Sequence, residues 1–144
     1  MELETAIEEL DDILFEVIMD QYQKLSSQAI DPDLKMKEHM VIEFLGRKEA
    51  AKMSKLASFF SVPPTTMTSI IDRLVKKGYL ERRRSEEDRR VVLVTLSQQG
   101  EEFFAQHEKE SHQGIKNIFS CLTEEELKQL VSIFTKLRNR YQSE

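Results

Sequence analysis

Apolar residues near the N-terminus recur at alternating spacings of four and three, the pattern of one face of an amphipathic helix. This seam comprises Leu3, Ile7, Leu10, Leu14 and Val17, and it is widened by Ile13, Ile18, Tyr22 and Leu25. We expect the helix to end at Asp31-Pro32, because proline lacks an amide hydrogen and disfavours helical geometry in the preceding residue. An acidic helix with so broad an apolar face needs a packing partner.

Three shorter helices are predicted in the middle of the chain. The first covers about residues 34–45, has Gly46 as its C-cap, and turns inward Met36, Met40, Val41, Phe44 and Leu45. The second covers residues 53–60, with Ser54 as its N-cap. The third begins at Pro64, where the missing amide hydrogen costs nothing, and ends at Gly78. Its inward face comprises Met67, Ile70, Ile71, Leu74 and Val75. Two helices joined by a tight turn at residues 61–64 predict a helix-turn-helix.

A β-hairpin is predicted directly after these helices. Residues 79–84 and 89–96 are rich in β-branched and aromatic residues, and a polar loop, residues 85–88, separates them. A helix-turn-helix followed by a hairpin is a winged helix. The expected fold class is therefore mainly α with a small β-hairpin, a winged helix-turn-helix flanked by N- and C-terminal helices.

Helical patterns resume after Gly100. Thr123 and Glu126 have the spacing of a capping box, and a second apolar seam follows it, made of Leu127, Leu130, Phe134, Leu137 and Tyr141. Both terminal seams would be buried if the helices of two subunits interlocked. We therefore expect a homodimer of a single 144-residue unit, in which residues 1–32 and 101–144 form dimerisation helices and residues 34–100 form the winged-helix lobe. Such a dimer would place two copies of the third middle helix about one DNA turn, roughly 34 Å, apart.

Positive charge is concentrated in one stretch of an acidic chain. The 144 residues have a net charge of -5, yet residues 47–100 hold 12 Lys and Arg against 6 Asp and Glu, a net +6, which leaves -11 for the rest. This split is typical of nucleic-acid-binding proteins, because neutralising phosphates releases counterions. Charge alone leaves open a solvated hairpin with a basic face.

The outward face of the third middle helix carries short hydroxyls near its start and cations near its end. These residues are Thr65, Thr66, Thr68, Ser69, Arg73 and Lys76. A helix in the major groove leads with its N-terminal turn, where small side chains approach base edges, while later Lys and Arg reach phosphates. The simpler alternative is an exposed helix start capped by Thr and Ser, with Arg73 solvated. The neighbouring hairpin favours DNA binding, because a tip arginine can enter the minor groove. Ser54 and Arg84 complete this candidate set.

Other classes of protein are disfavoured. The chain has three His at unrelated positions, no Gly-rich phosphate loop and no nucleophile motif, so we expect neither an enzyme nor a cofactor. It has no apolar run near the roughly 18 residues of a membrane span and no signal-peptide core, so we expect a cytoplasmic protein without a membrane partner. The single Cys121 has no CxxC partner, and we expect it to be a small buried hydrophobe.

The hairpin region also carries a family resemblance. Asp88-Arg89-Arg90 and Leu96-Ser97-Gln98-Gln99-Gly100 resemble the D-x-R wing and the following L-[ST]-x-x-G of the MarR (multiple antibiotic resistance regulator) family. Residues 68–74 and 76–82 are similar to that family's recognition helix and its exit into the wing. The resemblance implies a homodimeric winged-helix transcription factor, usually a repressor, that binds pseudo-palindromic double-stranded operator DNA. It also implies that Arg90 enters the minor groove, that Asp88 orients the tip by pairing with a nearby arginine, and that Arg89 is at a variable position.

The resemblance further implies a cleft between the dimer helices and the winged lobe, where many members respond to a small molecule, an oxidant or a metal. An apolar effector would contact residues at Met36, His39, Met40, Phe44, Phe103, Phe104 and His107, although core packing explains the same residues. His39 and His107 also resemble ligands of the family's zinc-sensing branch, which leaves a metal-responsive regulator as one alternative, with no metal site assigned. A winged helix that contacts only other proteins is the second alternative.

Overall fold

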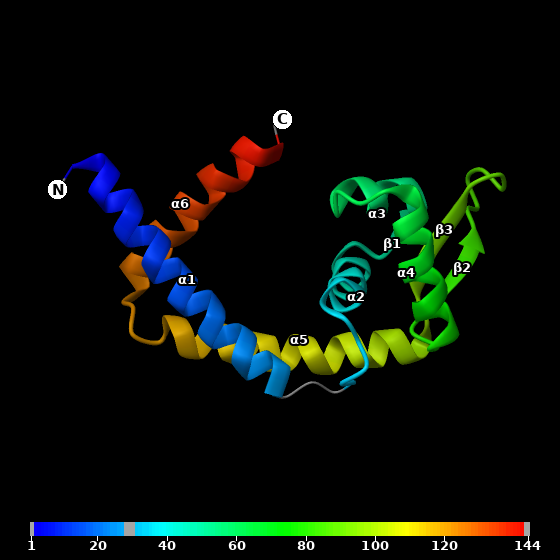
Figure 1. Cartoon of the computed structure of the whole chain (residues 1–144), viewed down its shortest axis with the longest axis horizontal. Coiled ribbons are helices and arrows are strands. Elements are labelled where there is room, and N and C mark those ends of the chain that lie inside the picture. The colour runs from blue at the N-terminus through cyan, green and yellow to red at the C-terminus, as the bar shows by residue number, and fades with distance from the viewer. Residues whose placement is uncertain (1, 28–30, 143–144) are drawn as a thin grey trace. The chain divides into compact units, whose positions relative to one another are not determined.

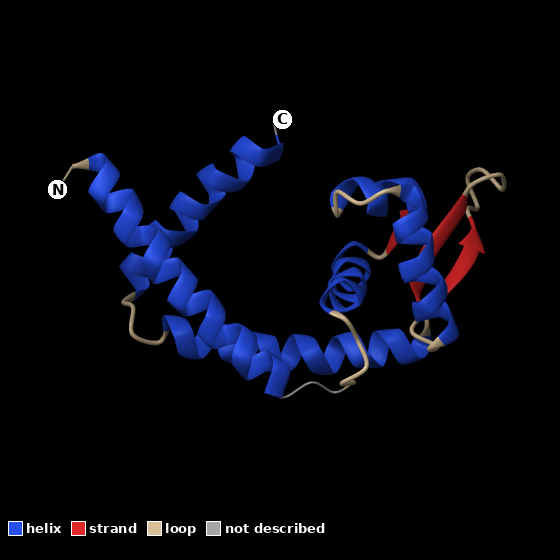
Figure 2. Cartoon of the chain, viewed as in Figure 1, coloured by secondary structure: helices blue, strands red, loops and turns tan. Residues whose placement is uncertain are grey.

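The computed structural model describes the chain except residues 1, 28–30 and 143–144. Its elements, in chain order, are α1 (Leu3–Ser27), α2 (Met36–Lys48), β1 (Ala50–Lys52), α3 (Met53–Phe59), α4 (Pro64–Lys76), β2 (Leu80–Arg84), β3 (Val92–Leu96), α5 (Gln98–Phe119) and α6 (Glu124–Gln142) (Figure 1). The chain divides into two compact units, residues 1–108 and 109–144, so α5 begins in one and ends in the other. Helices with a small sheet confirm the expected fold class (Figure 2).

The sheet has three antiparallel strands in the order β1-β3-β2, not the two expected. The additional strand β1 pairs with β3 through Ala50 with Thr95 and Lys52 with Leu93. The hairpin strands are also shorter than predicted, because the turn between β2 and β3 covers residues 85–91. Strand β1 covers one edge of β3 and leaves β2 at an outer edge of the sheet, where the wing extends from the lobe.

The core of the winged-helix lobe lies between α2, α3, α4 and the sheet. The large apolar residues with almost no exposure are Val41, Ile42, Leu45, Leu56, Met67, Ile71, Leu74, Leu80 and Val94. Burial of apolar surface stabilises such a cluster by roughly 25 cal/mol per Å² removed from water. The predicted inward face of α4 is confirmed at three of these positions, Met67, Ile71 and Leu74.

The predicted inward face of α2 is confirmed at Val41, Phe44 and Leu45 and was wrong at Met36 and Met40. Met36 and Met40 are about half exposed, whereas Glu38 and Ile42 are buried. Gly46 does not cap this helix, because α2 continues to Lys48. A Cβ atom at Gly46 would lie 2.3 Å from the Phe104 ring, so the glycine allows α5 to approach α2.

The ends of α3 and α4 follow local rules in part. Lys52, not Ser54, is the N-cap of α3, and Ser54 is the second helical residue. Pro64 starts α4 as expected. At the other end Gly78 has φ 89°, its amide bonds to the Val75 carbonyl, and the amide of Tyr79 bonds to the Leu74 carbonyl. This pair of bonds is a Schellman motif, which requires a left-handed residue at Gly78.

The start of α5 is fastened to the end of α4. The Ser97 hydroxyl donates to the Gly78 carbonyl and accepts from the Gly100 amide, while the Ser97 amide donates to the Tyr79 carbonyl at 2.9 Å. A Cβ atom at Gly100 would lie 2.0 Å from the Tyr79 carbonyl oxygen. The Ser97-x-x-Gly100 spacing therefore lets the first turn of α5 touch the turn after α4.

The terminal helices expose most of their apolar residues. α1 ends at Ser27, before Asp31-Pro32, and the side chain of Leu25 lies outside the described ones. The capping box of α6 is confirmed, since the Thr123 amide donates to Glu126 at 2.8 Å and the Glu126 amide donates to the Thr123 hydroxyl at 3.3 Å. Cys121 is exposed, so the prediction of a buried thiol was wrong.

Candidate nucleic-acid interface

One stripe of side chains runs along the exposed face of α4. Thr65, Ser69, Asp72 and Lys76 are all exposed, and their spacings of four, three and four place them on the same face. Thr66 and Thr68 are exposed beside this stripe. The Thr68 hydroxyl donates to the Pro64 carbonyl at 2.9 Å, so it can only accept from a ligand. The helix thus offers short hydroxyls at its first turns and an ammonium group at its last.

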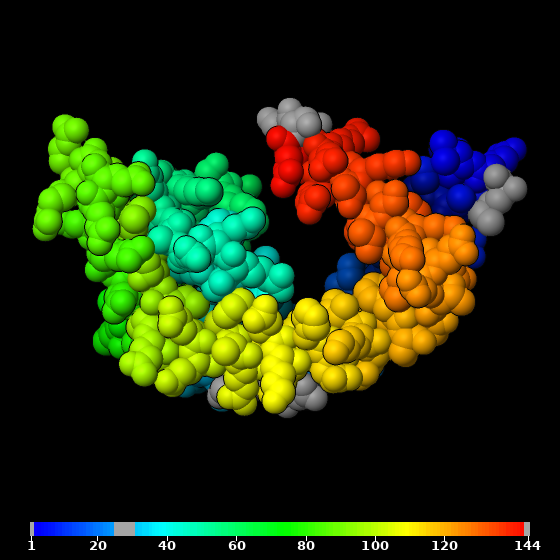
Figure 3. Space-filling view, turned by 180° about the vertical axis from the view of Figure 1, so that it is seen from behind, coloured from blue at the N-terminus to red at the C-terminus, as the bar shows by residue number. Residues whose placement is uncertain are grey.

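The wing presents an arginine at its tip. The side chain of Arg90 is 91% exposed, and its backbone amide and Nε both donate to Asp88 Oδ1, at 3.1 and 3.2 Å. Arg84 Nη1 donates to the Arg89 carbonyl at 2.9 Å, which ties the strand to the loop. In the space-filling view of Figure 3 the wing protrudes beyond the rest of the lobe. A carboxylate that grips Arg90 from within the loop restricts the directions in which its guanidinium can point.

A second ion pair joins the wing to α4 and was not anticipated. Arg82 of β2 pairs with Asp72, in the middle of the exposed stripe. In the antiparallel register Arg82 lies opposite the buried Val94, so it emerges on the face of the sheet that is directed to α4. The guanidinium of Arg82 offsets the carboxylate that would otherwise repel phosphate.

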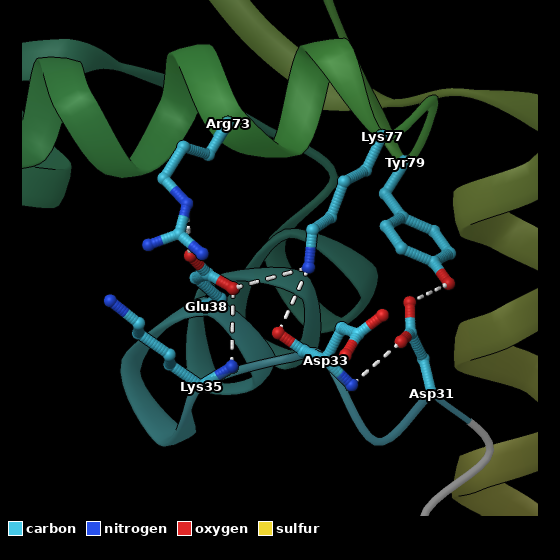
Figure 4. A network of polar contacts seen from close by, with 7 residues as sticks. All are labelled: Asp31, Asp33, Lys35, Glu38, Arg73, Lys77 and Tyr79. Atoms are coloured by element: carbon cyan, nitrogen blue, oxygen red, sulfur yellow. Dashed lines mark hydrogen bonds and ion pairs between the residues drawn. The ribbon is translucent and has the colours of Figure 1, made fainter.

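Arg73, expected to reach phosphate, is engaged by a buried carboxylate instead. Glu38 of α2 is 1% exposed, and its Oε1 lies 3.1 Å from Arg73 Nε. That contact has ion-pair distance without hydrogen-bond alignment, since Oε1 lacks a hydrogen bond. Glu38 Oε2 accepts from the Lys35 amide at 3.1 Å and lies 3.9 Å from Lys77 Nζ (Figure 4). Glu38 was not among the predicted site residues.

The same network continues into the segment before α2. The Tyr79 hydroxyl donates to Asp31 Oδ2 at 2.7 Å, and Lys77 Nζ donates to the Asp33 carbonyl at 2.9 Å. Burial and the bond to Asp31 raise the pKa of Tyr79 to about 12. The hydrogen bond from Tyr79 lowers the pKa of Asp31, against the opposing effect of burial.

The candidate effector residues lie in several places in the lobe. Phe44 packs against Phe59 and Phe60, Phe104 covers Gly46, and the Met36 and Met40 side chains are exposed. Three of them form a group of rings, in which the His39 ring contacts those of Phe103 and His107 at centroid distances of 5.5 and 4.2 Å. Burial, then the neighbouring His107, lowers the pKa of His39.

The described residues form neither a metal centre nor a membrane-spanning helix. Among the described residues there is no group of three or more His, Cys, Asp or Glu side chains that could hold a metal ion. Nor does any helix in residues 2–27 or 31–142 have the length and apolar character needed to cross a membrane.

The predicted dimerisation residues lie on α1 and α6. On α1 the exposed ones are Leu3, Ile7, Leu10 and Leu14. On α6, Leu127 and Leu130 are half-buried, and Phe134, Leu137 and Tyr141 are exposed.

A helix-turn-helix whose second helix exposes hydroxyls, followed by a wing with an arginine at its tip, defines the winged-helix class of regulators. Residues 34–92 match the model of the MarR family. This match covers the winged-helix lobe, and the members of the matched family are transcriptional regulators and not enzymes.

Several known proteins are similar to the chain. The uncharacterized HTH-type transcriptional regulator YpoP of Bacillus subtilis (strain 168) is 26% identical over 124 residues, which cover 86% of this chain and 88% of that protein. The transcriptional repressor MprA of Escherichia coli (strain K12) is 34% identical over 87 residues, 60% of this chain and 49% of MprA. The crystal structure of Streptococcus pneumoniae FabT in complex with DNA has 26% identity and a TM-score of 0.80, with 99% of both chains covered.

Proposed function

We propose that this chain is a sequence-specific repressor of transcription that acts in the cytoplasm as a homodimer on a pseudo-palindromic operator. The observation that carries the proposal is the combination, in one lobe, of the exposed stripe on α4 and the exposed Arg90 at the wing tip. The candidate DNA-binding residues are Ser54, Thr65, Thr66, Thr68, Ser69, Lys76, Arg84, Asp88, Arg89 and Arg90. Arg73 is paired with Glu38 instead.

The two exposed features suit the two grooves of a duplex. The major groove admits a helix, and the short side chains of Thr65 and Ser69 let the backbone of α4 approach base edges. The minor groove is narrow and has concentrated negative potential, which favours a guanidinium such as that of Arg90. The net charge of +6 over residues 47–100 supports this orientation of the lobe toward DNA.

The homodimer is supported by the exposed seams of α1 and α6. A single chain leaves large apolar side chains in water, Leu3 at 78% exposure and Tyr141 at 76%. Contiguous exposed apolar surface of this kind marks an interaction site. A symmetric pair of chains would bury both seams and present two α4 helices to successive major grooves.

The similar proteins support the same reading. FabT, 26% identical over nearly the whole chain, was solved in complex with DNA, and MprA is named a transcriptional repressor. We carry DNA binding and repression over from them to this chain as part of the proposal.

Selection of bound sites from random duplexes by the purified protein tests the proposal. We expect a consensus with dyad symmetry and half-sites one turn apart. A consensus without symmetry would contradict the dimeric arrangement, and no enrichment would contradict DNA reading.

The same selection with Thr65→Ala or Ser69→Ala tests whether α4 is the helix that contacts the bases. Loss of a base contact should change discrimination at one position of each half-site by roughly 1 to 3 kcal/mol. An unchanged consensus in both variants would remove α4 from base reading. The rival function, a winged helix that binds only proteins, predicts no affinity for duplex DNA at any salt concentration. For a DNA-binding protein, the logarithm of the binding constant falls linearly with log[salt].

A further inference from the structure

The buried carboxylate of Glu38 connects the recognition helix to the segment that follows α1 in the chain. We propose that Glu38 is a positioning residue for DNA binding: it anchors α4 through Arg73 and Lys77 and keeps these two cations from neutralising phosphate. This inference rests on the proposed function, because positioning has meaning only if α4 reads DNA.

The surroundings of Glu38 require a structural role for its charge. A buried carboxylate is costly unless it is paired with opposite charge and hydrogen-bonded. Glu38 lies in the first turn of α2, where the helix dipole favours an anion, and it accepts the Lys35 amide. The remaining compensation comes from Arg73 and Lys77, at 3.1 and 3.9 Å. The two cations are therefore held by the lobe itself.

The position of the two cations on α4 supports the same assignment. Residues 73 and 77 are four apart and lie on one side of the helix, between the exposed stripe and the buried face. Their side chains are only 44% and 26% exposed. Figure 4 shows both pointing toward Glu38 from the helix above it. Lys76, in contrast, belongs to the exposed stripe and forms no ion pair with a carboxylate of the described residues.

The anchor extends beyond Glu38 into residues 31–35. Lys77 Nζ also binds the Asp33 carbonyl, and the Tyr79 hydroxyl binds Asp31. Three points, at residues 31, 33 and 38, thus hold the last turn of α4 and the residues after it. A displacement of this segment would therefore act on the end of α4 through these contacts.

The dependence of affinity on salt separates a cation that positions from one that binds phosphate. We would measure operator affinity against salt concentration for the full-length protein and for Arg73→Gln, Lys77→Gln and Lys76→Gln. Each phosphate neutralised contributes about 0.9 to the slope of log K on log[salt]. Lys76→Gln should reduce the slope by about that amount. Arg73→Gln and Lys77→Gln should lower affinity several-fold and leave the slope unchanged.

Removing the Glu38 carboxylate should steepen the dependence of log K on log[salt], the opposite of the effect expected for Lys76→Gln. In Glu38→Gln, Arg73 and Lys77 are released, so the slope should steepen by about 0.9 for each of them that reaches a phosphate, and affinity for random duplex should rise relative to the operator. Glu43→Gln is the matched control, because it removes one negative charge from the same helix, where Glu43 pairs with Arg47 at 2.8 Å. It should leave slope and specificity unchanged. A carboxylate with a merely structural role would not alter the slope.

The outcomes are distinguishable. A slope reduced by about 0.9 in Arg73→Gln, or unchanged in a folded Glu38→Gln, overturns the positioning role while the proposed function stands. If Glu38→Gln does not fold, as thermal unfolding would reveal, the slopes of Arg73→Gln and Lys77→Gln decide alone. If the unaltered protein shows no salt-dependent binding to DNA, the proposed function is overturned, and this inference with it.

Discussion

The winged-helix lobe and the terminal helices use their apolar residues in opposite ways. In the lobe, Ile71 and Leu74 have no exposed surface, and they pack against the sheet and α2 within one chain. In α1 and α6 the apolar seams are exposed, and none of the described residues of α6 is buried. The difference teaches that a single chain can complete the core of the lobe, whereas the terminal seams need additional apolar surface, as the proposed homodimer would provide.

The largest effect should come from a charge placed in a terminal seam. Phe134→Asp removes an exposed ring and adds a carboxylate where apolar surfaces would meet, so we expect monomers and a loss of operator affinity of at least about 10³-fold, the gap between specific and non-specific binding. Sedimentation and gel-shift measurements check this. Ser132→Asp adds the same charge to the other side of α6 and should change neither. Monomers of Phe134→Asp that keep full operator affinity would break the comparison.

A truncation in the lobe core should act on folding instead. Leu74→Ala opens a cavity between α4 and its neighbours and should lower the free energy of unfolding by about 2 to 5 kcal/mol, as measured by denaturant unfolding. Val131→Ala, at an exposed position of α6 outside the seam, should change it by under about 0.5 kcal/mol. Equal effects of the two would mean that the lobe does not have the independent core described.

Arg90→Ala should weaken DNA binding without affecting assembly. Within the described part of the chain its guanidinium bonds only to the Asp88 carboxylate of its own loop, so its loss leaves the core intact. We expect about tenfold weaker operator binding, about 1.4 kcal/mol, with an unchanged sedimentation profile. Arg138→Ala removes the same charge from α6 and serves as the control. Unchanged affinity of Arg90→Ala would remove the wing tip from the interface.

The smallest effect concerns the contact between Tyr79 and Asp31. The pKa of Tyr79 is raised from 10.0 to about 12, so the stability contributed by the neutral phenol is complete below about pH 10 and is lost as pH rises from 10 to 12. The pKa of Asp31 is lowered, so its contribution is present above the ordinary value and is lost as pH falls through the lower one. An absorbance titration should show one tyrosine ionising late. If that late step remains in Tyr79→Phe, the assignment is wrong.

Elements with local signals were predicted well from the sequence. Pro64 and Gly78 mark the two ends of α4, and Thr123 with Glu126 marks the start of α6. Each of these signals satisfies backbone groups within a few residues, so no tertiary information is needed.

Elements that depend on distant contacts were missed. β1 is three residues long and has no β-branched residue, so only its pairing with β3 makes it a strand. Part of the inward face of α2 was missed because Glu38 belongs to it, and a carboxylate conceals an apolar pattern. In the same way Arg73 looked like a phosphate ligand, because its buried partner lies on another helix.

The bonds of Ser97 and the close approach of Gly100 to Tyr79 have a consequence for operators. They fasten both ends of the wing to the end of α4, so in the proposed complex α4 and the wing would bind a half-site as one unit. If so, inserting a single base pair between their two contacts inside a half-site should abolish specific binding. A change in the spacing between half-sites would instead require the winged-helix lobes of the two subunits of the proposed dimer to move apart as units.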